Sequence, residues 1–240
     1  VVTVTAANAQ GSINKTTPVT ITLATLSPNT FTDELNSDGD CSLREAIQAA
    51  NTDSPVDLCP AGNGADTIQL AAGTYTLALS GASEDANATG DLDATSAAGL
   101  SLVGAGANST ILDANGLDRV IHATAGAFTL NNLTIRNGNS AGKGGGVYAS
   151  SSLTLTNTRF ISNTATGCCG GGAYSDSTVT VANSIFSNNS SAGGGGGLYS
   201  FSTLEITDSQ FLSNTTTTQG GGVYARNTAT VANSLFQNNR

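Results

Sequence analysis

Two neighbouring stretches in the second half of the chain share one layout. Residues 153–177 read LTLTNTRFISNTATGCCGGGAYSDS, and residues 179–203 read VTVANSIFSNNSSAGGGGGLYSFST. Each starts with alternating apolar and polar residues, continues through an asparagine and a phenylalanine, and ends in a glycine block followed by tyrosine. Alternation with a period of two is typical of a β-strand with one buried face. The two stretches therefore predict a repeated β-unit of about 25 residues.

The layout recurs over five units and is defined by three columns of residues. A polar residue recurs at steps of 25, 26, 25 and 25, and a large apolar residue follows it three positions later. The polar column is Asn132, Asn157, Asn183, Asp208 and Asn233. The apolar column is Ile135, Phe160, Phe186, Phe211 and Phe236. A tyrosine column consists of Tyr148, Tyr174, Tyr199 and Tyr224. This fixed spacing argues against low-complexity disorder.

A unit of this size cannot close a core alone, because each short strand has one apolar face and two unpaired edges. Stacked coils solve both problems by pairing edge to edge at about 4.8 Å around a continuous apolar interior. The sequence therefore predicts an all-β parallel β-helix, with the phenylalanines inside and the tyrosines outside. We expect the polar column to occupy left-handed corners and to form an amide ladder from coil to coil. The glycine blocks are expected to supply turns with positive φ.

Several other stretches resemble a known family. They are CSLREAI at 41–47, DTIQLAAGTYTL at 66–77, LSLVGAG at 100–106 and the N-x-x-F and GGGxY repeats. Together they resemble the CSLREA-type right-handed β-helix proteins of bacterial surfaces, over about residues 30–240. The repeats are also similar to those of polymorphic outer-membrane proteins and autotransporter adhesins. The resemblance implies an exported right-handed β-helix of structural or adhesive type, often without catalysis.

A cap is expected at the N-terminal end of the solenoid. Ser42 and Glu45 match a capping box that opens a short helix over the first coil. We interpret Cys41 and Cys59 as a disulfide of an exported protein, with two buried free thiols as the alternative. For Cys168 and Cys169 a vicinal disulfide, an intermolecular link and small apolar residues stay equally open. The expected divisions are an extension at 1–29, the cap at 30–65 and the coils at 66–240.

Composition excludes several partners. The 240 residues contain 8 Lys and Arg against 17 Asp and Glu, a net charge of −9, so a nucleic-acid or anionic-lipid surface is not expected. No apolar run is long enough to span a membrane. Residues 1–127 hold 14 acids and 3 bases, whereas residues 128–240 hold 3 acids and 5 bases. The chain begins with Val1 and contains no Met, so we expect a processed or shortened secreted or cell-surface protein.

Candidate chemistry is sparse in the repeats. Their acids are Asp176, Glu205 and Asp208, which the columns place on different faces, and no cluster of Arg, Lys and Asp is expected to bind a uronate. The single histidine, His122, is interpreted as structural. We therefore predict no catalytic, cofactor or metal residues. Calcium in the acidic loop is the alternative, because five residues partly match a calcium-loop pattern: Glu34, Asn36, Asp38, Gly39 and Glu45.

These observations predict a non-enzymatic extracellular structural or adhesive β-helix. The expected partner is a second copy, joined end to end through the C-terminal coil and the strand-like residues 1–26, which would give a filament or surface layer. An extra coil formed by residues 1–26 of the same chain is the alternative. A host surface or a glycan is a further expected contact. The alternative function is a carbohydrate-active β-helix, either a polysaccharide lyase or a glycoside hydrolase.

Overall fold

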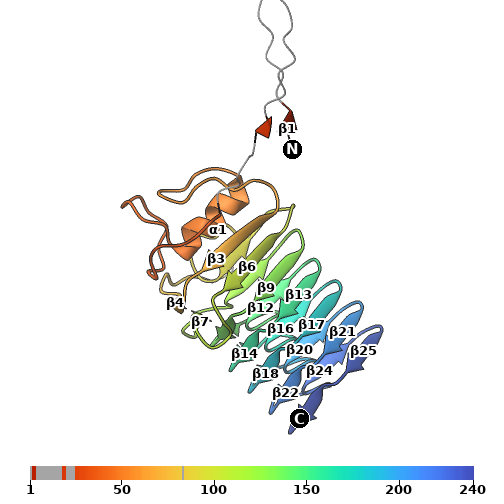
Figure 1. The fold of residues 1–240 in the computed structure, drawn as a ribbon. Coiled ribbons are helices and arrows are strands. Elements are labelled where there is room, and N and C mark those ends of the chain that lie inside the picture. Colours follow the sequence, from red (N-terminus) through yellow and green to blue (C-terminus); the bar gives the residue numbers. More distant parts are fainter. Residues whose placement is uncertain (1, 4–17, 20–24, 83) are drawn as a thin grey trace, which may run out of the picture.

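The computed structural model describes residues 2–3, 18–19, 25–82 and 84–240, and the main part of the chain is a parallel β-helix (Figure 1). Strands β1 (Val2–Thr3) and β2 (Pro18–Val19) pair antiparallel with each other. The rest of the predicted strand-like stretch 1–26 lies outside the described residues, apart from its last two positions. Leu26 is buried and forms a parallel bridge with Ile68.

Three sheets of parallel strands form the walls of the solenoid in the described chain. Sheet A contains β3 (Asp66–Leu70), β6 (Leu100–Gly104), β9 (Phe128–Asn131), β13 (Leu153–Thr156), β17 (Val179–Ala182), β21 (Leu204–Thr207) and β25 (Ala229–Ala232). Sheet B contains β4 (Gly73–Thr76), β7 (Thr110–Asp113), β10 (Thr134–Arg136), β14 (Arg159–Ile161), β18 (Ile185–Ser187), β22 (Gln210–Leu212) and β26 (Leu235–Gln237). Sheet C contains β5 (Leu92–Ala94), β8 (Ile121–Ala123), β12 (Val147–Ala149), β16 (Ala173–Ser175), β20 (Leu198–Ser200) and β24 (Val223–Ala225).

A fourth, short sheet lies between sheets B and C along the chain. It consists of β11 (Asn139–Ser140), β15 (Thr164–Ala165), β19 (Ser190–Ser191) and β23 (Thr215–Thr216).

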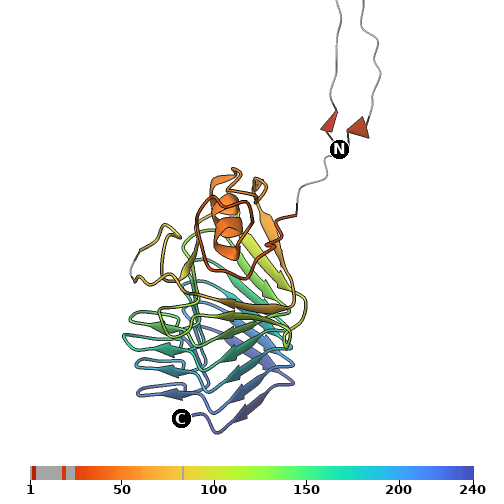
Figure 2. The same ribbon diagram turned by 90° about the vertical axis from the view of Figure 1, so that its left-hand side faces the viewer.

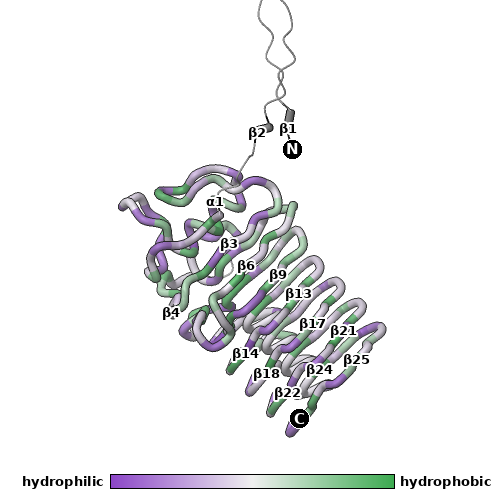
Figure 3. The backbone as a smooth tube through the Cα atoms, viewed as in Figure 1, coloured by the Kyte–Doolittle hydropathy of each residue, from purple (hydrophilic) through white to green (hydrophobic). Residues whose placement is uncertain are grey.

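The predicted burial of the apolar strand residues and of the phenylalanine column is confirmed through the coil of Phe211. In sheet A, Leu153 pairs in register with Val179 and Val179 with Leu204, and all three are buried. The rings of Phe160 and Phe186 stack in sheet B with centroids 4.6 Å apart, and the stack continues through the next two coils. Apolar segments accordingly recur from coil to coil in Figure 3. Each coil thus adds one layer to a continuous core.

The polar corner column adopts the left-handed backbone as expected, but among the described residues its predicted amide ladder is present only between Asn132 and Asn157. Asn157 and Asn183 both have φ of 50°, and Asn157 also donates to the side chain of Asn132. Most corner side chains point to solvent, so the column does not continue as a ladder. A continuous ladder runs instead through the asparagine six residues after each of the last four corners. Its members are Asn163, Asn189, Asn214 and Asn239, of which the first three are buried.

Only one glycine in each block has the positive φ that was expected for the turns. Gly170 has φ of 68° and Gly195 has φ of 70°. The following Gly171 is needed for a different reason, because a Cβ there would collide with the carbonyl oxygens of Ser190 and Gly196. Close approach between coils, as well as turn conformation, therefore demands glycine.

The N-terminal end of the solenoid is capped by α1 (Leu43–Thr52), which lies over the first coils in Figure 2. The side chain of Ser42 accepts from the Glu45 amide, and the Glu45 carboxylate accepts from the Ser42 amide, so the capping box is present. Cys41 and Cys59 form a disulfide, with Cα atoms 4.9 Å apart. Of the three alternatives for Cys168 and Cys169, the structure has the vicinal disulfide. Across the described ranges, no helix has the length and apolarity required for a membrane crossing.

Candidate functional site

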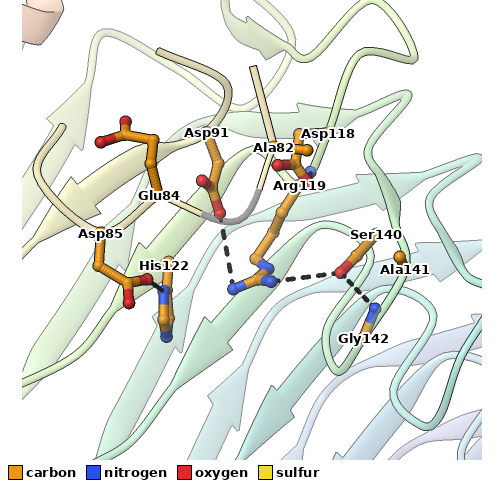
Figure 4. Close-up of a pocket in the computed structure, with 10 residues that line it drawn as sticks. All are labelled: Ala82, Glu84, Asp85, Asp91, Asp118, Arg119, His122, Ser140, Ala141 and Gly142. Carbon is orange, nitrogen blue, oxygen red and sulfur yellow. Dashed lines mark hydrogen bonds and ion pairs between the residues drawn. The ribbon is translucent and has the colours of Figure 1, made fainter. Parts of the chain in front are cut away.

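A polar pocket of about 250 Å³ opens on the side of the solenoid, next to the first strands of sheet C (Figure 4). The loop between β4 and β5, strand β8 with the turn before it, and the turn after β11 form its walls. Its lining is mostly charged or polar: Ala82, Glu84, Asp85, Asp91, Asp118, Arg119, His122, Ser140, Ala141 and Gly142. Most of the lining residues precede the regular repeats, and Ser140, Ala141 and Gly142 belong to the first repeat.

Asp91 and Arg119 face each other across the pocket. Arg119 Nη1 lies 3.5 Å from Asp91 Oδ2, and Arg119 Nη2 donates to the hydroxyl of Ser140 at 3.2 Å. Burial raises the pKa of Asp91 to about 7, and the neighbouring Asp93 and Asp118 carboxylates act in the same direction, while the Arg119 guanidinium opposes them. Arg119 Nε is buried and donates no hydrogen bond. The pocket therefore offers both a cation and carboxylates to a polar ligand.

The second group in the pocket surrounds His122 on β8. Its Nδ1 lies 3.1 Å from Asp85 Oδ1 and 3.6 Å from Asp93 Oδ1, and Figure 4 shows Asp85 directed at the imidazole. Asp93 is fully buried on β5 and pairs in register with His122. The imidazole also stacks on the ring of Tyr148, with centroids 4.7 Å apart. One side-chain oxygen each of Asp85 and Asp93 and one ring nitrogen of His122 all lie within 4.8 Å of one another.

The cap helix holds the pocket in place through Arg44, which is fully buried. Its guanidinium donates to both carboxylate oxygens of Asp33 and to the carbonyl oxygens of Gly90 and Asp91. The backbone carbonyl of Arg44 accepts from the Asn87 side chain, and the Asn87 amide donates to Asp93 Oδ2 at 2.9 Å. Arg44, the arginine of CSLREAI, thus holds the loop at 87–91, which contains Asp91 and leads directly to Asp93 on β5.

Beside the pocket, the Asp176 carboxylate connects Lys143, in the turn before the glycine block, with two members of the tyrosine column. It accepts from Lys143 Nζ at 2.9 Å, from Tyr148 Oη at 2.6 Å and from Tyr174 Oη at 3.0 Å. Burial alone would raise the pKa of Asp176, but these three hydrogen bonds hold it below its usual range. The tyrosine column was expected on an open surface. Tyr174 is only 3% exposed, because its ring packs between those of Tyr148 and Tyr199 and Lys143 lies over it.

The acids singled out in the repeats do not form a site together. Glu205 lies exposed on β21, Asp208 occupies a left-handed corner, and Asp176 belongs to the tyrosine cluster. Ahead of the repeats, Asp91, Asp118 and Arg119 line one pocket, so an Arg and Asp cluster is present outside the region to which the expectation applied, and whether it binds a uronate stays open to test.

In the acidic loop, both carboxylate oxygens of Glu45 accept backbone amides, from Asn36 and Ser42. The side-chain Nδ2 of Asn36 donates to the carboxylates of Glu34 and Asp38. These contacts favour the capping interpretation of Glu45. Calcium binding there stays a prediction.

A signal for the pocket was present in the repeat itself. The register position of the tyrosine column runs back through sheet C to His122 and then to Asp93. Two coils therefore carry a histidine and an aspartate where four coils carry tyrosine. Arg44, Asp85 and Asn87 gave no such signal, because they come from non-repeating segments.

The comparison with protein-family models gives one match, to the right-handed β-helix region, over residues 93–240. No curated protein and no solved structure matches the chain. The resemblance to CSLREA-type proteins and autotransporter repeats stays a prediction, because the family match begins beyond CSLREAI at 41–47. The parallel coils, their register and this match over more than half of the sequence lead to one conclusion: the chain belongs to the right-handed β-helix family.

Proposed function

We propose that the protein is a non-enzymatic extracellular structural or adhesive β-helix. The observation that carries the proposal is the repetition of the same buried contacts through residues 128–240. Stacked phenylalanines and the ladder from Asn163 to Asn239 recur in coil after coil. Such contacts spread stability along a rod instead of concentrating it around one site.

Two further features support an extracellular location. All four cysteines are paired in disulfides, and disulfides persist mainly in oxidising compartments. The outer positions of sheet A carry uncharged threonines in most coils, such as Thr154 and Thr180, so the rod presents a polar, weakly charged face. A surface of this kind suits a solvated structural element or a weak contact with a host surface or a glycan.

End-to-end association is part of this proposal. In the coil of β24, β25 and β26, Val231, Leu235 and Phe236 are 47%, 47% and 43% exposed. The columns of Val231 and Phe236 are buried in the coil before it, at Ile206 and Phe211, so a further β-coil stacked there would cover them. A second copy of the chain is the occupant that the proposal names.

Negative-stain electron microscopy of the purified full chain at high concentration tests this proposal. Filaments that lengthen with concentration are the expected result. Phe236→Asp should shorten them by placing a charge in the stacking interface, whereas Glu205→Gln on an exposed lateral face should leave them unchanged. Monodisperse short rods at every concentration would contradict the end-to-end association.

A carbohydrate-active β-helix is the second candidate, and the pocket of Asp91, Asp118 and Arg119 is the observation that favours it. Its carboxylates and guanidinium are groups that hydrogen-bond sugar hydroxyls. Incubation with neutral and acidic polysaccharides, followed by assays for reducing ends and unsaturated products, discriminates the two functions. Turnover that is lost in Asp118→Asn and kept in Asp208→Asn would replace the structural proposal with this one.

A further inference from the structure

The side chains of Asp85, Asp93 and His122 form a cluster that no structural role of the β-helix requires. In sheet C, the same register position carries tyrosine in four successive coils, and those rings pack on one another. His122 continues this stack against Tyr148, but Asp93 at the next position has no ring to contribute. A carboxylate with no solvent exposure costs free energy unless it is paired. Its presence in this column points to a ligand.

The hydrogen bonds of Asp93 leave one of its two oxygens unused. Oδ2 accepts from the Asn87 amide, and the Asn87 side chain accepts from the Asp93 amide, so the carboxylate is fixed in orientation. Oδ1 is buried and accepts no hydrogen bond. It lies on the side of His122, 3.6 Å from Nδ1. This fixed, unpartnered oxygen is the donor around which a site can form.

One proton on Nδ1 of His122 cannot serve as the hydrogen-bond donor to both Asp85 and Asp93. Nδ1 carries at most one hydrogen, and Asp85 Oδ1 at 3.1 Å is the nearer acceptor, so Asp93 Oδ1 is left without a donor. Without that hydrogen, the Nδ1 lone pair faces two carboxylates. A metal cation between the three atoms removes both problems, because each atom then donates a lone pair to the same centre.

We propose that Asp85, Asp93 and His122 bind a divalent first-row transition-metal ion, with Zn²⁺ as the reference. Imidazole nitrogen together with carboxylate oxygen suits Zn²⁺ and its neighbours, whereas Ca²⁺ and Mg²⁺ take mainly oxygen ligands. Two carboxylates neutralise the divalent charge. Three protein ligands leave a coordination position open for water or a polar ligand. Asp85 and His122 line the 250 Å³ pocket, so the open position faces that space.

Asn87 and Arg44 support the metal ligands from outside. Asn87 orients Asp93, and the Arg44 carbonyl in turn holds the Asn87 side chain at 2.8 Å. Groups that orient metal ligands in this way are part of the design of metal sites. The cap helix is therefore connected to the site through one continuous chain of hydrogen bonds.

The direct test is equilibrium dialysis of the untagged full chain, stripped with chelator, against Zn²⁺ alone. About one bound equivalent is expected. His122→Tyr places the residue of the repeat in its own column and keeps the stack, and Asp93→Asn keeps the shape and the Asn87 contact. Each should weaken Zn²⁺ binding by about 10–100-fold or more.

Asp57→Asn is the matched control, because it makes the same charge change in the separate acidic cluster of Asp40, Glu45 and Asp57. It should bind Zn²⁺ like the wild type. Substoichiometric binding by the wild type, undiminished binding by His122→Tyr and Asp93→Asn, or loss of binding in Asp57→Asn would each overturn the proposal.

The single histidine of the chain permits a second readout that does not depend on affinity. In protein with ¹⁵N-labelled histidine, Zn²⁺ should shift the Nδ1 resonance as the coordinated nitrogen and leave Nε2 protonated. Co²⁺ should give visible absorption bands that vanish in His122→Tyr. A shift at Nε2 instead of Nδ1 would place the metal elsewhere and contradict the geometry proposed.

Discussion

Residues 128–240 and the N-terminal half bury polar groups in opposite ways. In the repeats, one asparagine per coil serves the same purpose each time, as when Asn189 Nδ2 donates to the carbonyl of Phe160 and to the side chain of Asn214. Near the cap, the partners of the buried polar groups differ from one group to the next, and Arg44 contacts Asp33 and the loop at 87–91. Repetition gives a rod with interchangeable coils. The non-repeating network gives one specific pocket.

The difference also decides how damage should spread. A lost ladder residue affects its own coil and the two adjacent coils, because contacts in a solenoid are between neighbours. A lost network residue disconnects the cap helix, the loop before β5 and the pocket together. Substitutions near the cap are therefore expected to cost more than comparable substitutions in the repeats.

The largest effect is expected for Arg44→Met. The substitution keeps the length of the side chain but leaves the carboxylate of Asp33, which is 4% exposed, without its cation. Removing one partner of a buried ion pair lowers the free energy of unfolding by about 3–5 kcal/mol. Urea unfolding measures it. Arg226→Met is the control, because Arg226 lies exposed over the ring of Phe201, and a loss at Arg44 no larger than at Arg226 would refute the network.

Asn189→Ala should have the next largest effect. The change removes both hydrogen bonds of the side-chain amide and the acceptor used by the amide and side chain of Asn163, all of them buried. Unsatisfied buried polar groups cost about 1–3 kcal/mol each, so a loss of about 2–4 kcal/mol is expected from partial relaxation. Hydrogen exchange should report increased opening of the adjacent coils only. Uniform opening of the whole chain would contradict the nearest-neighbour view.

The same difference explains what the sequence could reveal. The spacing of Phe160, Phe186 and Phe211 predicted the coil length, the fold and the inward column, because a repeated contact leaves a repeated residue. It misplaced the amide ladder, since Asn157 and Asn163 recur with equal regularity and only burial distinguishes them.

The pocket could not be predicted in the same way. Arg44 and Asp91 are 47 residues apart, and neither belongs to a column of the repeat, so no periodicity links them. The capping box of Ser42 and Glu45 was readable because its two residues are local. The exception is the column of His122 and Asp93, where a departure from the repeat marks a chemical role.

A smaller effect is expected at the corner. Asn183 has φ of 50°, and its side chain is exposed, so its contribution comes from tolerance of the left-handed backbone. Asn183→Ala should lower the free energy of unfolding by about 1–2 kcal/mol, because residues with a Cβ are strained in this region. Asn183→Gly should be closer to neutral. If Asn183→Ala were as damaging as Asn189→Ala, the distinction between corner and ladder asparagines would fail.

The smallest effect is expected from acidification of the Asp176 cluster. The pKa of Asp176 is held below its usual range by hydrogen bonds from Tyr148, Lys143 and Tyr174, which outweigh the effect of burial. An acid whose folded pKa is depressed stabilises the fold fully above its unfolded pKa of about 3.9 and loses that contribution as the pH falls through the folded pKa.

Urea unfolding of the wild type and of Asp176→Asn, at a series of pH values from neutral downwards, measures this contribution. Lys143 and Asp176 are 37% and 31% exposed, so solvent screening limits the difference to less than about 1 kcal/mol at neutral pH. The difference should shrink as the pH falls below about 4 and the wild-type carboxylate becomes protonated. A difference that grew on acidification would mean that burial dominates and that the pKa is raised instead. The Asp176 carboxylate would then destabilise the fold instead of stabilising it. Asp93 in sheet C is in the same position when no cation is bound.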